Sequence, residues 1–457
     1  MSSPPQDGAT LQLAGYIASM RREDLDEKTV DHAKKLLLDG IGCLIAGTSG
    51  AVARSASRAF EPMAGEGGGP TTNLVTGRQT SARDAAFVNG VALYSIGLND
   101  IHRPSISHPG GCIIPAILAV GQWKRSKGVD LLKAMTAGYE VMGRMGAAMQ
   151  PSHWDRGFHP TGTFGTFGAA AAVSRLLDLD RSKIASAFGI AGSQAGGIQA
   201  YHTDGSLTMI YHAGRSAQNG VEAALLAQEG FTGPHYVFED PVGYLALTSD
   251  NPKLSALTDK LGENLAINAT SFRPYYGCTA TIAASAAAEV IAKRRIGQAG
   301  NIRSVKIRVH PEAVKVIDFG DPQTLLAARI SMQFNVAIVL DQGAVLMRDA
   351  ESKDLRSDSV RRLIGVSKVV PDPEVSYWGS AVEVDYADGS RESVLEENPK
   401  GDPSNPMTWR DTEEKFLALT TPNIESGAEK IIEVVRSVEE HQGDHLVSVI
   451  ARAIGHA

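Results

Sequence analysis

The hydrophobic residues of this chain recur at helical spacing over more than half of its length, and this pattern constrains the fold most. From Thr10 to about Gly262, apolar residues return every three or four positions, which predicts amphipathic helices packed on a common core. Many of these segments are rich in Ala and Gly, whose small side chains let helices approach closely. The clearest predicted helices cover residues 29–47, 81–98, 129–145 and 213–234. We therefore expect a many-helix bundle.

The pattern changes its period after this helical region. In residues 302–310, apolar and polar side chains alternate, which indicates a half-buried strand. The pair Asp388-Gly389 stands between two β-type runs within residues 381–394, which is a hairpin signal. Residues 326–345 lie between these strands and favour a helix. Together these segments predict an α+β unit.

Helical spacing returns from Trp409 to the end, after the Pro/Gly-rich stretch 398–408. A helical segment that follows an α+β unit predicts that the chain returns to the first domain. The expected fold class is therefore mainly α, with a discontinuous all-α helical-bundle domain and an inserted, smaller α+β domain. We place the all-α domain at residues 1–270 plus 405–457, and the α+β domain at residues 271–404.

Composition excludes several function classes. The 457-residue chain has a net charge of −7 and no run of Lys or Arg, so nucleic acid is not an expected partner. No window reaches the roughly 18 apolar residues of a membrane span, and the first residues lack a secretory signal, so no membrane partner is expected. The three cysteines lie far apart without a CxxC pair, which favours a reducing compartment, and we expect an intracellular, cytoplasmic protein.

Titratable residues gather in one irregular segment, NDIHRPSISHPGG, at residues 99–111. Two prolines and a Gly-Gly pair interrupt any helix there, and Asp100, His102 and His108 lie among them. Irregular backbone with such groups is a common setting for catalysis, and also for caps and turns. The spacing of the two histidines does not predict a metal site, and the chain has no GxxxxGK[ST] phosphate loop.

Six segments along nearly the whole chain, taken in order, resemble the MmgE/PrpD family. They are SISHPGGCIIPAILA (105–119), GYEVMGRM (138–145), GFHPTGTFGTFGAAAAVSRLLDLD (157–180), HAGRSAQNGVEAALLAQEGFTGP (212–234), FRPYYGCTAT (272–281) and ISMQFNVAIVL (330–340). Six segments in order are specific for the family, although not for one reaction, because the family includes dehydratases, decarboxylases and an epimerase.

The resemblance implies a discontinuous all-α domain, an inserted α+β domain and an active cleft between them. It also implies a homodimer that needs no organic cofactor and acts on a small carboxylated organic substrate. The family's lyases abstract a proton next to a carboxylate and expel hydroxide or carbon dioxide. Such chemistry needs a base with a pKa near neutrality, which suits His, and fixed positive charge that holds the carboxylates.

The resemblance assigns His108 and His159 as the acid/base candidates. The alternative for His108 is a loop histidine that caps a helix starting near Cys112, and for His159 it is a histidine satisfied by backbone before a helix. Asp100 falls where the family has a cluster of acids, and it either orients a histidine or caps a turn. His102 stands where the lyases have a small polar residue, and it is either a substrate contact or an exposed loop histidine.

Further candidates for substrate binding come from two later segments. Arg273 occupies the position of a family lysine and is expected to anchor a carboxylate. His212 aligns with a histidine of the lyases. Tyr211, Tyr275 and Tyr276 either donate hydroxyl hydrogen bonds to the substrate or pack as aromatic side chains.

Two residues near these motifs are interpreted as structural. Arg144 is expected to neutralise a buried acid rather than touch the substrate, and Cys278 is expected to be a packed thiol rather than a nucleophile.

The chain departs from the family's lyases at Met209, where they carry a lysine three residues before the histidine. An apolar side chain there removes a charge-assisted hydrogen bond to a carboxylate, worth about 1.5–3 kcal/mol. We therefore expect poor binding of tricarboxylates such as citrate and methylcitrate, and a substrate that is less highly charged than these acids. The departures favour specialised metabolism.

These observations predict a cofactor-independent lyase, of the dehydratase or decarboxylase type, that abstracts a proton next to a carboxylate of a small organic acid. The first alternative is an epimerase or double-bond isomerase that uses the same acid/base pair. The second is a family member without catalysis that works as a binding or structural subunit.

Overall fold

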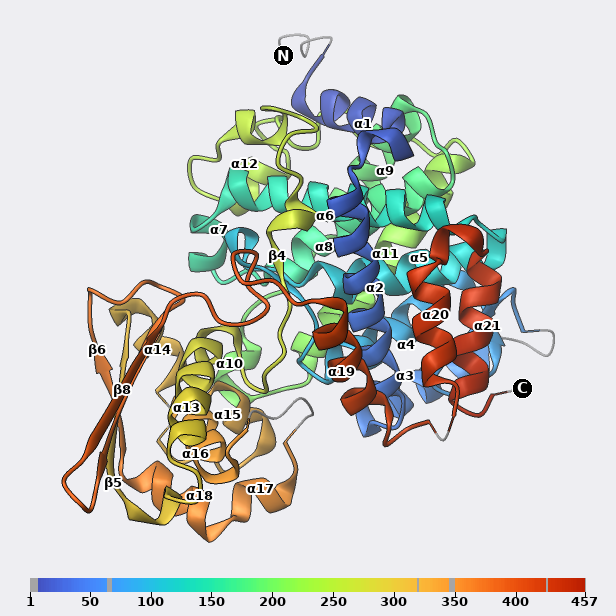
Figure 1. Ribbon diagram of the computed structural model, residues 1–457. Coiled ribbons are helices and arrows are strands. Elements are labelled where there is room, and N and C mark those ends of the chain that lie inside the picture. The colour runs from blue at the N-terminus through green and yellow to red at the C-terminus, as the bar shows by residue number, and fades with distance from the viewer. Residues whose placement is uncertain (1–6, 64–67, 319, 345–349, 425, 457) are drawn as a thin grey trace. The chain divides into compact units, whose positions relative to one another are not determined.

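The computed structural model describes residues 7–63, 68–318, 320–344, 350–424 and 426–456. The chain divides into two units, which Figure 1 shows as ribbons. Unit 1 comprises residues 1–271 and 409–457, and unit 2 comprises residues 272–408. Unit 1 is helical apart from four two-residue strands, and unit 2 combines helices with one four-stranded sheet among the described residues. The predicted fold class, mainly α with a smaller α+β part, is confirmed.

The helices of unit 1 follow the segments with helical spacing. The longer ones are α1 (Ala9–Ser19), α2 (Glu27–Thr48), α3 (Ala51–Phe60), α4 (Ala82–Ser95), α5 (Pro109–Lys124), α6 (Gly128–Met149), α8 (Pro160–Leu176), α9 (Arg181–Gly192), α11 (Thr208–Gln228), α19 (Trp409–Thr420), α20 (Ala428–Arg436) and α21 (Gly443–Ala453). Short helices are α7 (Ser152–Asp155), α10 (Tyr201–Asp204) and α12 (Tyr244–Thr248). The short strands pair as β1 (Thr71–Thr72) with β2 (Gln79–Thr80), and β3 (Ile101–His102) with β4 (Thr270–Ser271).

Helix α8 is the centre of unit 1, with α6 and α11 packed against it (Figure 1). Nearly all of its residues are buried. Glycines make the close packing possible: a Cβ atom on Gly138 of α6 would lie only 2.8 Å from the carbonyl oxygen of Gly168 of α8. Likewise, a Cβ on Gly90 of α4 would lie 2.9 Å from the Cα of Gly214 of α11. The close helix approach expected from the small residues is therefore present.

Two predicted helices need correction at their ends or in their interior. The helix predicted at 81–98 begins as expected, because the Ser81 hydroxyl accepts a hydrogen bond from the Asp84 N–H, but it ends at Ser95. The segment 326–345 forms two helices, because the extended backbone of Ser331 interrupts it and its hydroxyl caps the second helix. Residue 345 lies outside the described residues.

Unit 2 is built on the predicted strand and hairpin. Its sheet has the order β6–β5–β7–β8, in which only the β5–β6 pair is parallel. The β7–β8 hairpin turns at Gly389, whose φ of +84° suits glycine. Figure 1 shows α13 and α16 against this sheet. The elements are α13 (Ile282–Arg294), β5 (Ile302–Val309), α14 (Pro311–Ile317), α15 (Leu325–Ile330), α16 (Met332–Gln342), α17 (Ser352–Arg356), α18 (Asp358–Gly365), β6 (Ser367–Pro371), β7 (Ser380–Tyr386) and β8 (Arg391–Glu396).

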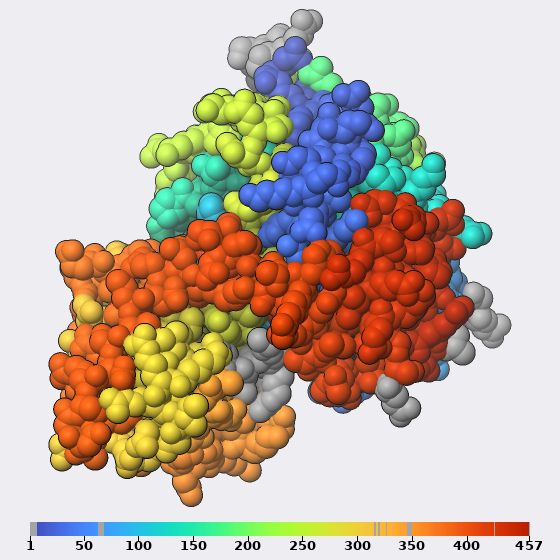
Figure 2. Space-filling view, viewed as in Figure 1, coloured from blue at the N-terminus to red at the C-terminus, as the bar shows by residue number. Residues whose placement is uncertain are grey.

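The last segment of the chain completes unit 1. Helix α19 packs on α2, and Figure 2 shows the red C-terminal residues against the blue N-terminal ones. The Lys415 ammonium is fully buried, lies 2.5 Å from the Asp39 carboxylate and donates a 2.6 Å hydrogen bond to the Leu98 carbonyl. A buried charge requires such partners, so α19 is bound to the interior of unit 1 by an ion pair as well as by apolar contacts.

Among the described residues, no single helix is long and apolar enough to cross a membrane. Helices α2 and α3 meet the length and composition criteria only when they are taken together, and the chain bends by 82° between them.

Candidate active site

Both candidate histidines immediately precede a helix that begins with proline. His108 precedes Pro109 of α5, and His159 precedes Pro160 of α8. Proline suits the first helical position, and it forces the preceding residue out of the helical conformation. Both histidines occupy the N-cap position of their helix, as the alternative for His108 predicts, but neither imidazole makes a capping hydrogen bond. The helix also begins at Pro109 rather than near Cys112, because proline initiates it.

The imidazole of His108 has a fixed orientation. Its Nδ1 lies 2.6 Å from the backbone oxygen of Asp100. A carbonyl oxygen only accepts hydrogen bonds, so neutral His108 carries its hydrogen on Nδ1, and its Nε2 presents a lone pair. The backbone N–H of His108 donates to the Thr161 hydroxyl at 3.1 Å, which joins the start of α5 to the start of α8. This tautomer is the one that a general base acting through Nε2 requires.

The side chain of Asp100 holds the loop against α5. Its two carboxylate oxygens accept from the Gly110 N–H at 3.1 Å each, and Oδ2 accepts a 2.6 Å hydrogen bond from the Tyr139 hydroxyl. Burial raises the pKa of Asp100 to about 6, although the Tyr139 hydrogen bond opposes this shift. The Asp100 backbone therefore orients His108, and its carboxylate accepts a hydrogen bond from the first turn of α5. A direct catalytic role for Asp100 stays a prediction.

His159 is paired with His212, which comes from α11. Their Nδ1 atoms lie 3.0 Å apart, and the two residues are 4% and 8% exposed. Burial holds the pKa of His159 well below 6.5, and the nearby His212, His108 and His202 lower it further. Burial also lowers the pKa of His212 to about 4. Both rings are therefore neutral at pH 7.

Two tyrosines connect the three histidines. The Tyr94 ring, from the end of α4, lies 5.5 Å from the His108 ring and 6.4 Å from the His159 ring, between centroids. The Tyr201 ring, from α10, lies 5.4 Å from the His159 ring and 5.9 Å from the His212 ring. We call His108, His159, His212, Tyr94 and Tyr201 the histidine cluster. Sequence reasoning missed both tyrosines, because an aromatic residue in or beside a helix usually indicates core packing.

Met209 and Tyr211 lie on the same helix as His212. Met209 is half-buried, one helical turn before His212, and packs against an apolar group that includes Tyr94. Tyr211 is 45% exposed, and its ring makes an edge contact with Phe87 at 5.8 Å. Their predicted substrate contacts stay predictions.

His102 is not part of the histidine cluster. Its ring is buried, and Nδ1 lies 2.8 Å from the Ser105 hydroxyl. Its backbone lies in β3, which pairs with β4. The alternative of an exposed loop histidine is therefore wrong, because His102 is only 5% exposed. A substrate contact of His102 stays a prediction.

The candidates from unit 2 are also buried. The Arg273 guanidinium donates to the carbonyl of Gly277, and Tyr275 packs with Ile282 and Ala286. The Tyr276 hydroxyl donates to the Leu325 carbonyl at 3.0 Å, which matches the packing interpretation. Carboxylate binding by Arg273 and a hydrogen bond from Tyr275 to the substrate stay predictions.

Cys278 packs against the apolar core of unit 2. Burial raises the pKa of its thiol, although the Arg273 charge opposes this shift. A thiol with a raised pKa is a poor nucleophile at pH 7, as the packed-thiol interpretation requires.

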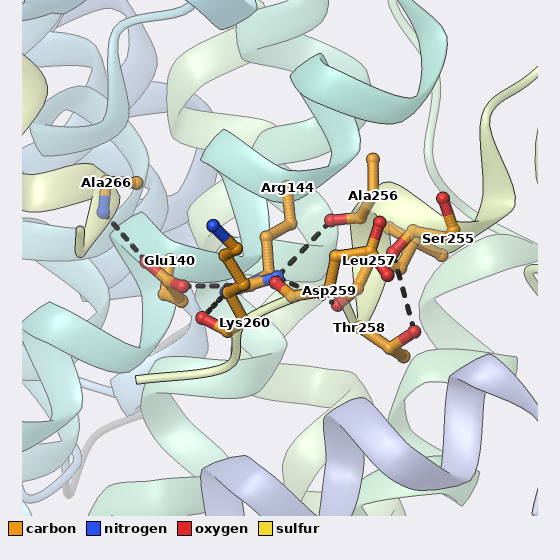
Figure 3. Close-up of polar contacts among 9 residues, drawn as sticks. All are labelled: Glu140, Arg144, Ser255, Ala256, Leu257, Thr258, Asp259, Lys260 and Ala266. Atoms are coloured by element: carbon orange, nitrogen blue, oxygen red, sulfur yellow. Dashed lines mark hydrogen bonds and ion pairs between the residues drawn. The ribbon is translucent and has the colours of Figure 1, made fainter. Parts of the chain in front are cut away.

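Arg144 neutralises a buried acid, as the sequence predicts. Its Nε donates to Glu140 at 2.6 Å, and its two amino groups donate to the carbonyls of Ala256, Leu257, Asp259 and Lys260. Figure 3 shows these contacts, together with the 2.8 Å hydrogen bond from the Ala266 N–H to Glu140. The Glu140–Arg144 ion pair connects α6 to residues 256–266, which lead into β4. It therefore supports β4, whose partner strand β3 precedes His108 in the chain.

The described residues contain no group of three or more His, Cys, Asp or Glu side chains arranged to hold a metal ion.

Family models match most of the chain. Residues 11–257 match the MmgE/PrpD N-terminal domain, and residues 275–440 match the MmgE/PrpD C-terminal domain. The first match includes the whole histidine cluster and the second includes Tyr275 and Tyr276, whereas Arg273 lies between the two matched ranges.

Similar proteins align over nearly their full length. The cis-aconitate decarboxylase-like protein oryM of Aspergillus oryzae is 29% identical, with 93% of each chain covered. The cis-aconitate decarboxylase of Homo sapiens is 26% identical, with 94% of this chain and 92% of that protein covered. The cis-aconitate decarboxylase of Mus musculus is 28% identical, with 94% and 91% covered.

Proposed function

Because the chain belongs to the MmgE/PrpD family, we propose that it is a lyase of the dehydratase or decarboxylase type that acts on a small carboxylated organic acid. The observation that carries the proposal is the grouping of His108, His159 and His212 around Tyr94 and Tyr201, with the His108 tautomer set by Asp100. The relatives named cis-aconitate decarboxylase support this class of reaction.

The proposed mechanism uses His108 as the general base. Its Nε2 lone pair takes the proton next to a substrate carboxylate, while the Asp100 carbonyl stabilises the imidazolium through Nδ1–H. His159 exchanges the second proton, either with the leaving group or with the product carbon. Arg273 holds a substrate carboxylate through its fixed charge. In this proposal no organic cofactor takes part, and the enzyme is a cytoplasmic homodimer.

Met209 supports a substrate that is less highly charged than the tricarboxylates. The half-buried thioether adapts to apolar shapes, whereas it gives a carboxylate no charged partner. We therefore propose a mono- or dicarboxylate with an apolar substituent, of the kind found in specialised metabolism.

The test is an activity screen with histidine variants. Candidate acids are incubated at millimolar concentration, and unsaturated product and carbon dioxide are measured. In His108→Asn, the amide replaces Nδ1 but nothing replaces the basic Nε2. We expect this variant, and His159→Asn, to lower kcat by about 10²–10⁴-fold.

The matched control is His445→Asn, which alters an exposed histidine of α21 and leaves the activity of the parent. Folding of each variant is checked by circular dichroism. If both His108→Asn and His159→Asn retain full activity, the catalytic proposal is wrong, and a binding or structural subunit becomes the better explanation.

An epimerase or double-bond isomerase is the second candidate, because the same proton abstraction needs no leaving group and the family's lysine is absent at Met209. Incubation in deuterated water separates the two. Deuterium incorporation without release of water or carbon dioxide supports the isomerase, whereas either release supports the lyase.

A further inference from the structure

The hydrogen bond between His159 and His212 joins two neutral rings through like atoms. Both partners contribute Nδ1, at a separation of 3.0 Å. One ring must donate through Nδ1–H, and the other must accept through a lone pair. The accepting ring then carries its own hydrogen on Nε2. The pair therefore has two arrangements, which differ only in which ring donates.

The surroundings of His159 oppose a positive charge on its ring. The residue is 4% exposed, and His212, His108 and His202 all lie close enough to disfavour its protonation. An isolated histidine in this place would exchange a proton with a substrate only by becoming a buried imidazolium, which desolvation makes costly. Buried acid/base chemistry at His159 thus needs a path that avoids this charge.

We propose that His159 and His212 form a proton relay, in which His212 is the positioning residue that keeps His159 neutral. This inference rests on the proposed function of His159. A proton that binds Nε2 of His159 sends the hydrogen on its Nδ1 to Nδ1 of His212. The proton on Nε2 of His212 then passes to solvent water. One proton enters and one departs, and both rings end neutral with their tautomers exchanged. The reverse sequence delivers a proton.

Two glycines permit the approach of His212 to the start of α8. A Cβ on Gly162 would lie 2.7 Å from the Gly196 carbonyl oxygen and 3.2 Å from the His212 Cβ. Gly197 has a φ of +150°, which favours glycine, and a Cβ there would lie 3.2 Å from the Gly162 Cα. The Tyr201 ring covers both imidazoles at 5.4 and 5.9 Å between centroids. The pair is therefore held by backbone packing and by aromatic contact.

The first test measures tautomers and needs no substrate. Full-length protein is labelled with ¹⁵N-histidine, and the ring signals are assigned by their loss in His159→Asn and His212→Asn. At pH 7 we expect both rings to be neutral, with complementary tautomers or exchange between them. In His212→Asn the amide keeps a hydrogen bond to His159 but cannot relay, so we expect His159 to adopt one fixed tautomer. A cationic ring at pH 7, or identical His159 signals in parent and variant, overturns the relay.

The second test is kinetic and uses an acid that the parent converts. We expect His212→Asn to lower kcat by about 100-fold while KM changes by less than about threefold. The dependence of the parent's kcat on the deuterium fraction of the solvent should be curved, because more than one proton moves. It should become linear in His212→Asn and stay curved in the His445→Asn control.

The two proposals fail in different ways. If the parent converts an acid and His212→Asn converts it equally fast, the relay is wrong and the proposed function stands. If the parent converts none of the candidate acids, the proposed function fails, and the tautomer measurement alone decides whether the histidine pair has the required protonation.

Discussion

Asp100 illustrates how one residue positions a candidate base through two different groups. Its carbonyl accepts from Nδ1 of His108, and its carboxylate accepts from Gly110 and Tyr139. The carboxylate therefore fixes the backbone that fixes the histidine. A Cβ atom on residue 110 would lie 2.7 Å from Oδ1 of Asp100. The hydrogen bond from the Gly110 N–H to this carboxylate therefore favours glycine at position 110.

The raised pKa of Asp100 predicts a pH-dependent stability. Its ordinary pKa is 3.8 and the folded value is about 6, so the folded state binds the proton more tightly. The resulting stability is complete below 3.8 and is lost as the pH rises to about 6. At roughly 1.4 kcal/mol per pKa unit, we expect the parent to lose about 3 kcal/mol relative to Asp100→Asn between pH 3.8 and 7. Chemical denaturation across this range measures the difference.

Tyr139→Phe is the matched control for this prediction. The Tyr139 hydroxyl favours the ionised carboxylate, so its removal raises the pKa of Asp100 further. The loss of stability should then extend to a higher pH than in the parent. Parallel stability curves for the parent and Asp100→Asn would contradict the assignment of a raised pKa.

Met209 carries the second prediction at the residue scale. In Met209→Lys, a new charge-assisted hydrogen bond should tighten tricarboxylate binding by roughly 10- to 100-fold, equivalent to about 1.5–3 kcal/mol. Calorimetry with citrate measures the change, and Met209→Leu serves as an apolar control. The parent should not usefully dehydrate 2-methylcitrate or decarboxylate cis-aconitate. Robust turnover of either acid by the parent would show that no cation is needed at this position.

At the scale of elements, the Glu140–Arg144 pair joins α6 to the segment before β4. Glu140 is 2% exposed, so Arg144→Met leaves its charge buried without its ion-pair partner. We expect a loss of about 3–5 kcal/mol of stability. Hydrogen exchange should also accelerate in residues 255–266.

A double-mutant cycle controls this prediction. Replacing both residues, as Glu140→Met with Arg144→Met, removes the unpaired charge and should cost less than the sum of the two single changes. Strict additivity would mean that the ion pair does not couple the segment to α6.

At the scale of the whole molecule, contacts between residues far apart in the chain stabilise unit 1. Lys415 and Leu98 are separated by 317 positions, yet they share a hydrogen bond beside Asp39. We expect Lys415→Met to destabilise unit 1 by about 3–5 kcal/mol, because it removes the ammonium group that forms an ion pair with the buried Asp39 carboxylate. Thermal and chemical denaturation measure the loss.

The paired variant separates charge from packing. Asp39→Asn with Lys415→Met removes both charges, so it should be more stable than Lys415→Met alone. If the two variants are equally unstable, the lost packing of the lysine chain, rather than the charge on Asp39, accounts for the effect.

The periodicity of apolar residues predicted an element correctly where the same face of that element is buried along its whole length. The alternation in 302–310 became β5, and Asp388-Gly389 became the turn of the β7–β8 hairpin. It failed at Ser331, where a hydrogen bond of one side chain to the backbone competes with helix continuation. It also misplaced the start of α5, because Pro109 outweighs the apolar pattern that follows it.

For the candidate site, the sequence by itself determined the residue types and their local backbone. Histidine before proline gives a non-helical residue at a helix start, and this requires only neighbouring atoms. Tertiary structure alone decided the partners: His212 meets His159 across 53 positions, Tyr94 reaches both His108 and His159, and Lys415 neutralises Asp39. These contacts depend on helix packing, and burial then sets the pKa of each group. Periodicity carries no record of either, because it reports which face of an element is buried and not which side chain lies opposite.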